Sequence, residues 1–226
     1  MSVLTPLVAS DPASPRLTVY DEAAGTRMEF SAITLDNWAN KIANMLIDEF
    51  DAPDTAILLD LPVSWQAAVL PLGITTAGLT TVVDTAQNMT PTAEPRLVFT
   101  TTDRAQQWVD AGVADVAVVS DDPFGRGVVE SGGTLPIGAV DFGPTVRFYG
   151  DQYYGDSPDL AQWVNPEVTN TAERLLVPGW RNREEFDRYV LAPLAADGSV
   201  VVVTGMASAE RLAHITEAEK VTRQLV

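Results

Sequence analysis

The residues of this 226-residue chain that could do chemistry are mostly aspartates and threonines at the ends of apolar runs. In an open α/β sheet, ligands bind beyond the carboxyl ends of the strands. Applied to the strands that the apolar pattern predicts, this rule selects six residues to line a crevice: Asp60, Asp84, Thr101, Thr102, Asp121 and Thr204. Their carboxylates and hydroxyls could bind a polar ligand, although no motif accompanies them.

A second candidate is the densest group of polar and aromatic residues in the chain. It contains Tyr149, Asp151, Tyr153, Tyr154, Asp156 and Asp159. The aspartates lack the order of a calcium-binding loop, so solvated or turn-capping carboxylates are the simpler interpretation. The aromatic rings could anchor this segment on the core or offer contact area to a partner. We predict no metal site here.

Catalytic motifs are otherwise missing. The single histidine, His214, lies in a predicted helix with no placed serine nearby, and the chain has no cysteine. Neither a Ser-His-Asp arrangement nor a thiolate nucleophile is therefore indicated. The patterns G-x-S-x-G, H-E-x-x-H and G-x-G-x-x-G do not occur. We predict no catalytic residues, no cofactor and no metal.

The charge balance restricts the partners. Fourteen basic and thirty-one acidic residues give a net charge of −17, which repels polyanions and argues against nucleic-acid binding. No apolar run is long enough to span a bilayer, and the N-terminus lacks the basic start of a signal peptide. The sequence therefore predicts a cytoplasmic protein without a membrane partner. A protein partner or a homo-oligomer remains open.

The elements that must position these residues alternate between strand and helix patterns, which predicts an α/β fold. We expect three layers in one domain over residues 1–226, with one mostly parallel sheet flanked by helices. Expected strands cover 17–21, 28–30, 55–59, 80–83, 97–101, 116–120, 145–149, 174–177 and 199–204, the first two as a β-hairpin. Expected helices cover 31–50, 64–77, 103–111, 183–195 and 208–220, with Ser31, Ser64, Asp103 and Ser208 as N-caps. Residues 121–170, rich in Gly, Pro and Asp, form an irregular excursion.

Several short motifs follow one another in a particular order: Phe30-Ser31-Ala32-Ile33, the helix from Trp38 to Leu46, Leu58-Leu59-Asp60-Leu61-Pro62, Leu191-Ala192-Pro193-Leu194 and Lys220-Val221-Thr222. This order resembles the N-terminal region of the adenylate-forming superfamily, which comprises acyl-CoA synthetases, peptide-synthetase adenylation domains and luciferases. The chain resembles a small actinobacterial group of shortened relatives of that superfamily. The resemblance implies a scaffold shared with ATP-using ligases.

The departures from the family bear on function. The resemblance implies a Ser/Thr/Gly-rich phosphate loop ending in Pro-Lys-Gly, but residues 146–158 at the corresponding place carry Asp151 and Asp156 and no lysine. The family's later motifs, its C-terminal domain and its adenylation lysine are not expected in this chain. We therefore predict a catalytically incomplete relative that is a ligand-binding or accessory protein. A protein-interaction or homodimerising module and a residual acid–CoA ligase-like or nucleotide-binding activity are the alternatives.

Overall fold

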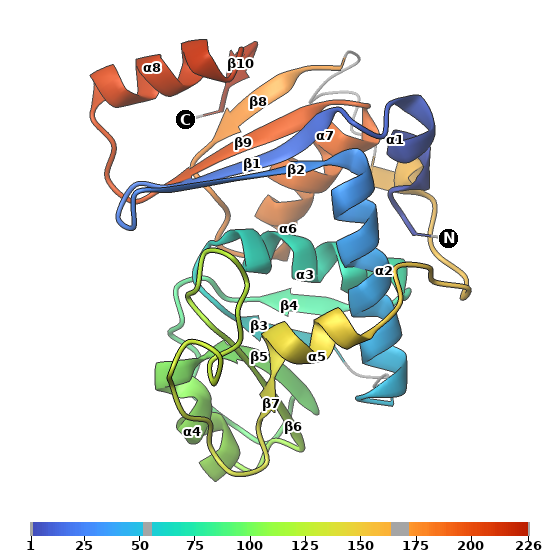
Figure 1. Cartoon of the computed structure of the whole chain (residues 1–226), viewed down its shortest axis with the longest axis vertical. Helices are drawn as coiled ribbons and strands as arrows, with labels where there is room; N and C mark the ends of the chain where they lie inside the picture. Colours follow the sequence, from blue (N-terminus) through green and yellow to red (C-terminus); the bar gives the residue numbers. More distant parts are fainter. Residues whose placement is uncertain (1, 52–55, 164–171, 226) are drawn as a thin grey trace. The chain divides into compact units, whose positions relative to one another are not determined.

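The computed structural model describes residues 2–51, 56–163 and 172–225 (Figure 1). Two compact units make up the chain. The first unit comprises Met1–Ser2, Asn37–Pro62 and Gln66–Ser157, and the second comprises Val3–Asp36, Val63–Trp65 and Pro158–Val226. Each unit has a five-stranded sheet of its own.

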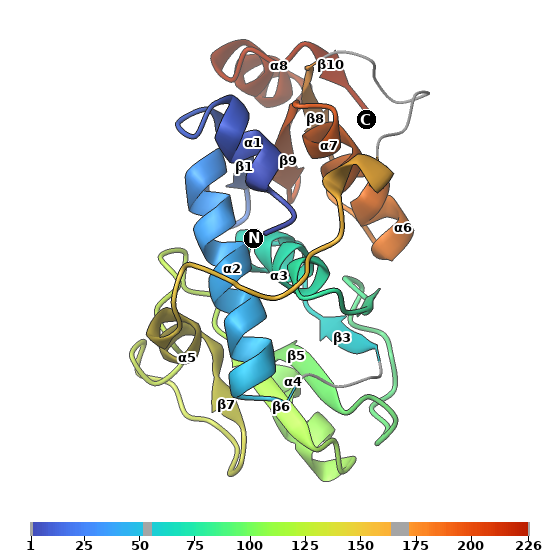
Figure 2. The ribbon, with the colours of Figure 1, turned by 90° about the vertical axis from the view of Figure 1, so that its right-hand side faces the viewer.

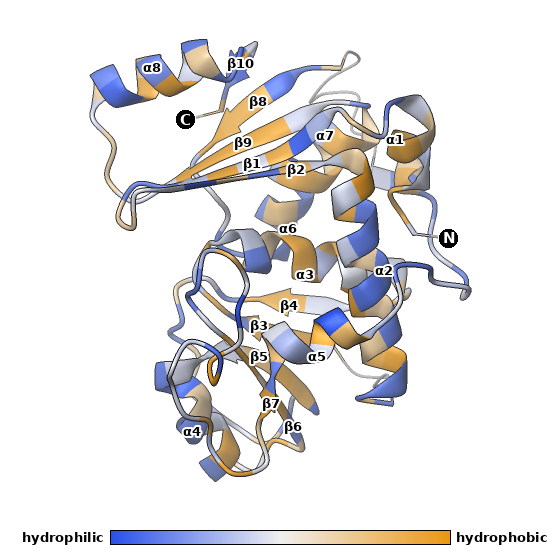
Figure 3. Cartoon of the chain, viewed as in Figure 1, coloured by the Kyte–Doolittle hydropathy of each residue, from blue (hydrophilic) through white to orange (hydrophobic). Residues whose placement is uncertain are grey.

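The sheet of the first unit is parallel throughout the described residues, in the order β4-β3-β5-β6-β7. Its strands are β3 (Ile57–Asp60), β4 (Thr81–Val83), β5 (Leu97–Thr101), β6 (Asp115–Val119) and β7 (Val140–Asp141). The helices α4 (Thr102–Asp110) and α5 (Phe142–Phe148) follow β5 and β7. The strands are strongly hydrophobic (Figure 3), as expected for parallel strands covered on both faces.

The sheet of the second unit has the order β10-β8-β9-β1-β2, and only the β1–β2 hairpin is antiparallel. Its strands are β1 (Pro15–Asp21), β2 (Thr26–Ser31), β8 (Arg174–Val177), β9 (Ser199–Thr204) and β10 (Arg223–Gln224). Its helical segments are α1 (Thr5–Ser10), η1 (Leu160–Trp163), α6 (Arg183–Phe186), the π-helix η2 (Asp187–Leu191), α7 (Ala192–Ala195) and α8 (Ala209–Ala218). The predicted hairpin is confirmed.

The helices α2 (Ala32–Asp48) and α3 (Trp65–Thr76) begin directly after the predicted N-caps and end within two residues of the predicted ends. The Ser31 hydroxyl accepts a hydrogen bond from the Thr34 N–H at 3.3 Å, which caps α2. Gly78, with φ +73°, ends α3 because it lets the Leu79 N–H reach the Ile74 carbonyl at 3.0 Å. A Cβ on Gly73 would lie 2.4 Å from the Ile42 Cβ, so α2 and α3 touch where only glycine fits.

The α/β class with parallel sheets flanked by helices is confirmed, but the expectation of one sheet is wrong. The strand β1 pairs with β9, about 180 residues further along the chain, and apolar periodicity carries no information on such distant pairing. The expectation of a single domain over residues 1–226 stays a prediction.

Two local predictions are also wrong. Residues 142–148 form the helix α5 where we expected a strand at 145–149, and Pro144 is tolerated because it lies in the first turn of that helix. Thr101, and not Asp103, occupies the N-cap position of α4. The last part of the expected irregular excursion, residues 164–170, lies outside the described residues.

Candidate functional site

Five of the six predicted crevice residues lie at the carboxyl edge of the first unit's sheet, and three of them shape the loop that covers this edge or are bonded by it. Asp60 ends β3, Thr101 ends β5 and Asp84 follows β4. The Gln87 side-chain amide links two of these ends, since its Nε2 donates to the Asp60 carbonyl at 3.2 Å and to the Thr101 hydroxyl at 3.0 Å. The loop of residues 84–89 thus covers this edge.

Asp60 is fully buried and serves as an acceptor for the core. Its Oδ2 accepts from the Arg104 Nε at 2.6 Å, from the Trp108 Nε1 at 2.7 Å and from the Thr100 hydroxyl at 3.2 Å. Its Oδ1 has no hydrogen-bond partner among the described residues. With no exposed surface, the carboxylate holds α4 on the sheet and does not face a ligand.

Asp84 has a similar structural role. Its Oδ2 accepts from the Asn88 and Met89 N–H groups at 3.0 Å each, and its Oδ1 accepts from the Ala86 N–H at 3.2 Å. The Arg104 Nη2 donates to the Met89 carbonyl at 2.9 Å. The carboxylate therefore shapes the loop over the edge of the sheet, and only 9% of the residue is exposed.

Of the remaining crevice candidates, Thr102 directly follows β5 and Asp121 follows β6, so both lie at the same edge of the sheet. Thr102 and Asp121 are exposed in the first unit. Thr204 belongs to the second unit, where its hydroxyl donates to the Tyr20 carbonyl at 3.2 Å. Ligand binding by the six residues stays a prediction. The burial of Asp60 and Asp84 argues against their contact with a ligand.

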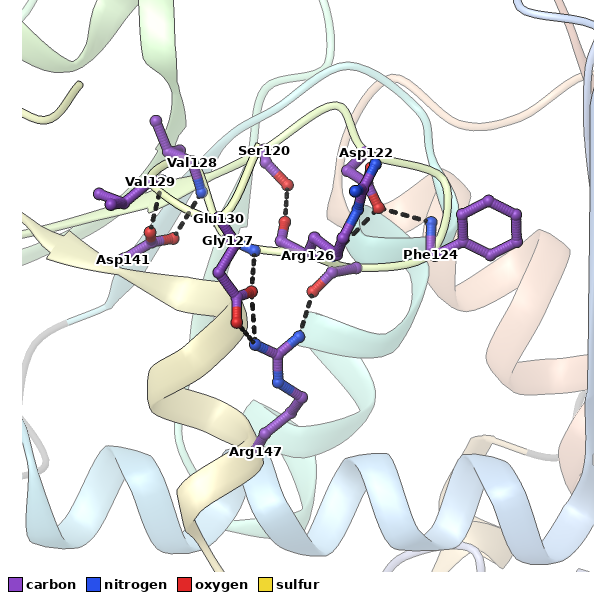
Figure 4. Close-up of polar contacts among 11 residues, drawn as sticks. Ser120, Asp122, Phe124, Arg126, Gly127, Val128, Val129, Glu130, Asp141 and Arg147 are labelled. Carbon is purple, nitrogen blue, oxygen red and sulfur yellow. Dashed lines mark hydrogen bonds and ion pairs between the residues drawn. The ribbon is translucent and has the colours of Figure 1, made fainter. Parts of the chain in front are cut away.

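In the loop after β6, residues 120–131, carboxylates bind backbone N–H groups and arginines, and the sequence analysis did not select them (Figure 4). The Asp122 Oδ1 accepts from the Phe124 N–H at 2.9 Å and from the Arg126 N–H at 3.1 Å. The Arg126 guanidinium also bonds the Asp122 Oδ2, at 2.7 and 3.0 Å. These hydrogen bonds outweigh partial burial and hold the pKa of Asp122 below its ordinary value.

Two more carboxylates cap the same loop. Asp141, at the end of β7, accepts from the Val128 N–H at 3.0 Å and the Val129 N–H at 3.1 Å. Glu130 accepts from the Gly127 N–H at 2.7 Å and pairs with the Arg147 guanidinium, which lowers the pKa of Glu130. Five backbone N–H groups of the loop are therefore occupied by the chain's own carboxylates, in the manner of bound anions. The Asp-x-Phe-Gly spacing, typical of an Asx turn, was the signal available in the sequence.

The tyrosine-rich segment, residues 149–154, crosses α2 in the first unit (Figure 2). The Lys41 Nζ donates to the Tyr149 carbonyl at 2.6 Å, and the Asn44 Nδ2 donates to the Gly150 and Gln152 carbonyls at 2.9 Å each. The Tyr149 hydroxyl donates to the Glu49 Oε2 at 2.8 Å; burial and this carboxylate raise the pKa of Tyr149 to about 12.

The other predicted members of that segment differ in their surroundings. The Tyr153 N–H donates to the Asn40 Oδ1 at 3.0 Å. Asp151 and Tyr154 are exposed, and the Tyr154 hydroxyl donates to the Gln152 side chain at 2.6 Å. No group of three His, Cys, Asp or Glu side chains in the described residues could hold a metal ion.

A charged cluster in the second unit centres on Glu219. Its carboxylate accepts from the Tyr20 hydroxyl at 2.6 Å, from the Arg27 Nε at 2.8 Å and from the Arg174 Nη2 at 2.5 Å. Burial alone would raise the pKa of Glu219, but these three hydrogen bonds together lower it to about 2. The cluster ties α8 to β1, β2 and β8, and is structural.

The second unit also has a half-open hollow of about 200 Å³. Its wall is mostly apolar and includes Leu7, Leu160 and Leu194. At its border the Ser10 hydroxyl donates to Asp197 at 3.0 Å, and Asp197 pairs with Arg16 at 2.7 Å. The polar groups of the border are thus paired with each other. His214 is exposed on α8, as predicted.

Arginine side chains are the chain's main source of positive charge, and nearly all of them are engaged. In the described residues, eleven of the twelve arginines form ion pairs with the chain's own carboxylates. The twelfth, Arg188, lies over the Tyr189 ring at 5.6 Å. No helix in this part of the chain is long and apolar enough to cross a membrane.

Comparison with known proteins gives one strong sequence match. A TIGR03089 family protein of Mycobacterium tuberculosis is 34% identical over 247 residues, which cover 99% of this chain and 96% of that protein. No protein-family model matches the chain.

Solved structures match at the level of the fold. A Brucella canis acyl-CoA synthetase has a TM-score of 0.70 at 16% identity and is matched over 47% of its length. The acetoacetyl-CoA synthetase of Streptomyces lividans has a TM-score of 0.71 at 13% identity, matched over 42%. For MatB from Rhodopseudomonas palustris the values are 0.68, 14% and 49%. In each case 99% of this chain is covered, so it spans about half the length of these structures.

Proposed function

The chain belongs to the TIGR03089 family, and from that premise we propose that it is a catalytically incomplete relative of the AMP-binding enzymes. It has the fold of acyl-CoA synthetases, but it does not form adenylates. Its role is that of a ligand-binding or accessory protein in the cytoplasm.

The observation that carries this proposal is the state of the positive charges. An enzyme that transfers adenylate must neutralise the phosphates of ATP with cations and aligned backbone N–H groups. Eleven arginines in the described part of the chain are paired with its own carboxylates. Of the two lysines, Lys41 donates to the Tyr149 carbonyl and Lys220 is exposed just after α8.

The loop after β6 supports the same proposal. Five of its N–H groups already bind the carboxylates of Asp122, Glu130 and Asp141. A phosphate would have to displace one of these carboxylates and then lie beside the others. Like charges at such distances repel strongly, so this loop is a poor phosphate site.

Pyrophosphate exchange with ATP and a panel of carboxylic acids tests the proposal. We expect no exchange above background, because adenylate formation is the step measured. A thermal-shift screen with ATP, AMP, CoA and acyl-adenylate analogues runs in parallel and reports ligand binding without turnover. Acid-dependent exchange would refute the proposal and would support a residual acid–CoA ligase-like activity.

A protein-interaction or homodimerising module is the second candidate function. The observation that favours it is a set of large apolar side chains left in solvent on the first unit. These are Phe124, 77% exposed, Ile137, 98%, Phe148, 87%, and Tyr154, 88%. Light scattering at several protein concentrations separates the two forms of this candidate, since a homodimerising module gives twice the monomer mass.

A further inference from the structure

We propose that residues 148–156 of the first unit form a docking segment for an arginine-bearing stretch of another protein. This inference rests on the second candidate function and names the chemistry of its partner. It requires a segment that is held in shape, side chains that are available, and a charge that selects the partner.

The backbone of the docking segment is held in shape by α2. Three α2 side chains, Lys41, Asn44 and Asn40, bond the backbone of residues 149–153. One Asn44 nitrogen binds the Gly150 and Gln152 carbonyls at 2.9 Å each, so these two oxygens are at most 2.9 + 2.9 Å, about 6 Å, apart. The chain bends at Asp151, outside any helix or strand, and one side-chain amide of α2 holds both sides of the bend.

Tyr153 and Gly155 tighten the same turn. A Cβ on Gly155 would lie 2.2 Å from the Tyr153 hydroxyl oxygen, so the ring packs across the glycine. Burial, with the nearby Asp156 charge, raises the pKa of Tyr153. The segment is thus ordered before any partner arrives, which lowers the entropy lost on binding.

Two aromatic side chains of this ordered segment nevertheless point into solvent. Phe148 is 87% exposed and Tyr154 is 88% exposed. The Phe148 ring packs on that of its neighbour Tyr149 in a T-shaped arrangement, with centroids 5.8 Å apart and planes at 88°. Exposed aromatics on a rigid backbone are the usual anchors of protein interfaces.

The charge of the segment selects a cationic partner. Asp151 and Asp156 are exposed, and neither forms an ion pair with any residue of the described chain. Carboxylates interleaved with aromatic rings suit a guanidinium group. The guanidinium can form an ion pair with a carboxylate and stack on the face of a ring. A second copy of this chain is a poor partner, because it carries the same net charge of −17 and eleven of its twelve arginines are ion-paired in the described residues.

Fluorescence anisotropy with a labelled peptide of alternating glycine and arginine tests the proposal at physiological salt. We expect the variant Phe148→Ala/Tyr154→Ala to bind the peptide about 4- to 25-fold more weakly, since each of the two exposed cation–π contacts gives about a two- to fivefold effect. The same peptide with citrulline in place of arginine keeps the shape without the charge and should not bind. Circular dichroism of each variant verifies folding.

Two variants of equal charge separate docking from general attraction to an acidic protein. Asp151→Asn/Asp156→Asn should weaken binding several-fold, whereas Glu94→Gln/Glu210→Gln, at exposed positions elsewhere, should not. Equal losses of peptide affinity in the aspartate and the glutamate variants would overturn the proposal. Unchanged peptide binding by Phe148→Ala/Tyr154→Ala would overturn it as well. Amide resonances perturbed by the peptide should lie within residues 148–156; perturbations confined to other residues would also overturn it. None of these outcomes depends on pyrophosphate exchange.

Discussion

Replacing Glu219 by glutamine tests the charged cluster of the second unit. The Glu219 side chain is only 6% exposed and accepts hydrogen bonds from Tyr20, Arg27 and Arg174. Its pKa is about 2 in the folded chain against an ordinary value of 4.5. A carboxylate whose pKa is lowered in the folded state gives its full stabilisation when it is ionised in both the folded and the unfolded chain. That stabilisation falls as the pH drops below the pKa of the unfolded chain.

The magnitude follows from that difference. It is 4.5 − 2, or about 2.5 pH units, and at about 1.36 kcal/mol for each unit the contribution is about 3 kcal/mol. The contribution is fully present above about pH 4.5 and is lost as the pH falls toward 2. Glu219→Gln should therefore cost about 3 kcal/mol at neutral pH, leaving two guanidinium groups without their acceptor. The cost should shrink steadily below about pH 4.5.

Native-state hydrogen exchange of the β1 and β9 amides is the suitable assay, because a chain of two units need not unfold in one step. Glu210→Gln in the first turn of α8 is the matched control, since Glu210 is exposed and forms no ion pair within the described residues. A loss below about 0.5 kcal/mol, within the usual range of surface substitutions, would refute the reasoning. So would a loss that is the same at neutral pH and at about pH 3.

Three further predictions concern the first unit. Asp60→Asn should destabilise it by about 3 kcal/mol in urea unfolding, because Arg104, 16% exposed, loses its ion-pair partner; Asp121→Asn, an exposed control, should change little. Gly73→Ala should cost about 1–3 kcal/mol despite the better helix propensity of alanine, because the new Cβ meets Ile42; Gly150→Ala, which meets open space, is the control. Tyr149 should ionise at about pH 12 in an ultraviolet titration, and Glu49→Gln should lower that midpoint by removing the acceptor and its charge. An unchanged midpoint would contradict the assigned cause.

Local signals in the sequence predicted most elements of the fold. Ser31 before a helical apolar pattern located α2, and apolar runs ending in a polar residue located β3 and β5. The predicted strand at 145–149 was wrong because the β-branched and aromatic residues of this segment favour a strand. In the structure, α5 instead places Arg147 against Glu130 and the Gly125 carbonyl, a tertiary contact that no window of sequence contains.

The candidate site was predictable in position and not in role. The rule for parallel sheets selected Asp60, Asp84 and Thr101, and the structure places them at one edge. Their roles depend on donors from elsewhere, such as Arg104 and Trp108 for Asp60. The sequence shows that a carboxylate is present; only the fold shows that it is already bonded and buried.

The similarity to acyl-CoA synthetases and the net charge of this chain lead to different expectations about the ligand. At 12–16% identity the solved structures share the course of the backbone, and a fold by itself does not specify chemistry. Ligands respond to the side chains, and here an excess of seventeen negative charges coexists with arginines that are already paired. Such a surface opposes nucleoside triphosphates and attracts cations. We therefore expect the partner of the docking segment to bring positive charge that matches its exposed carboxylates and aromatic rings.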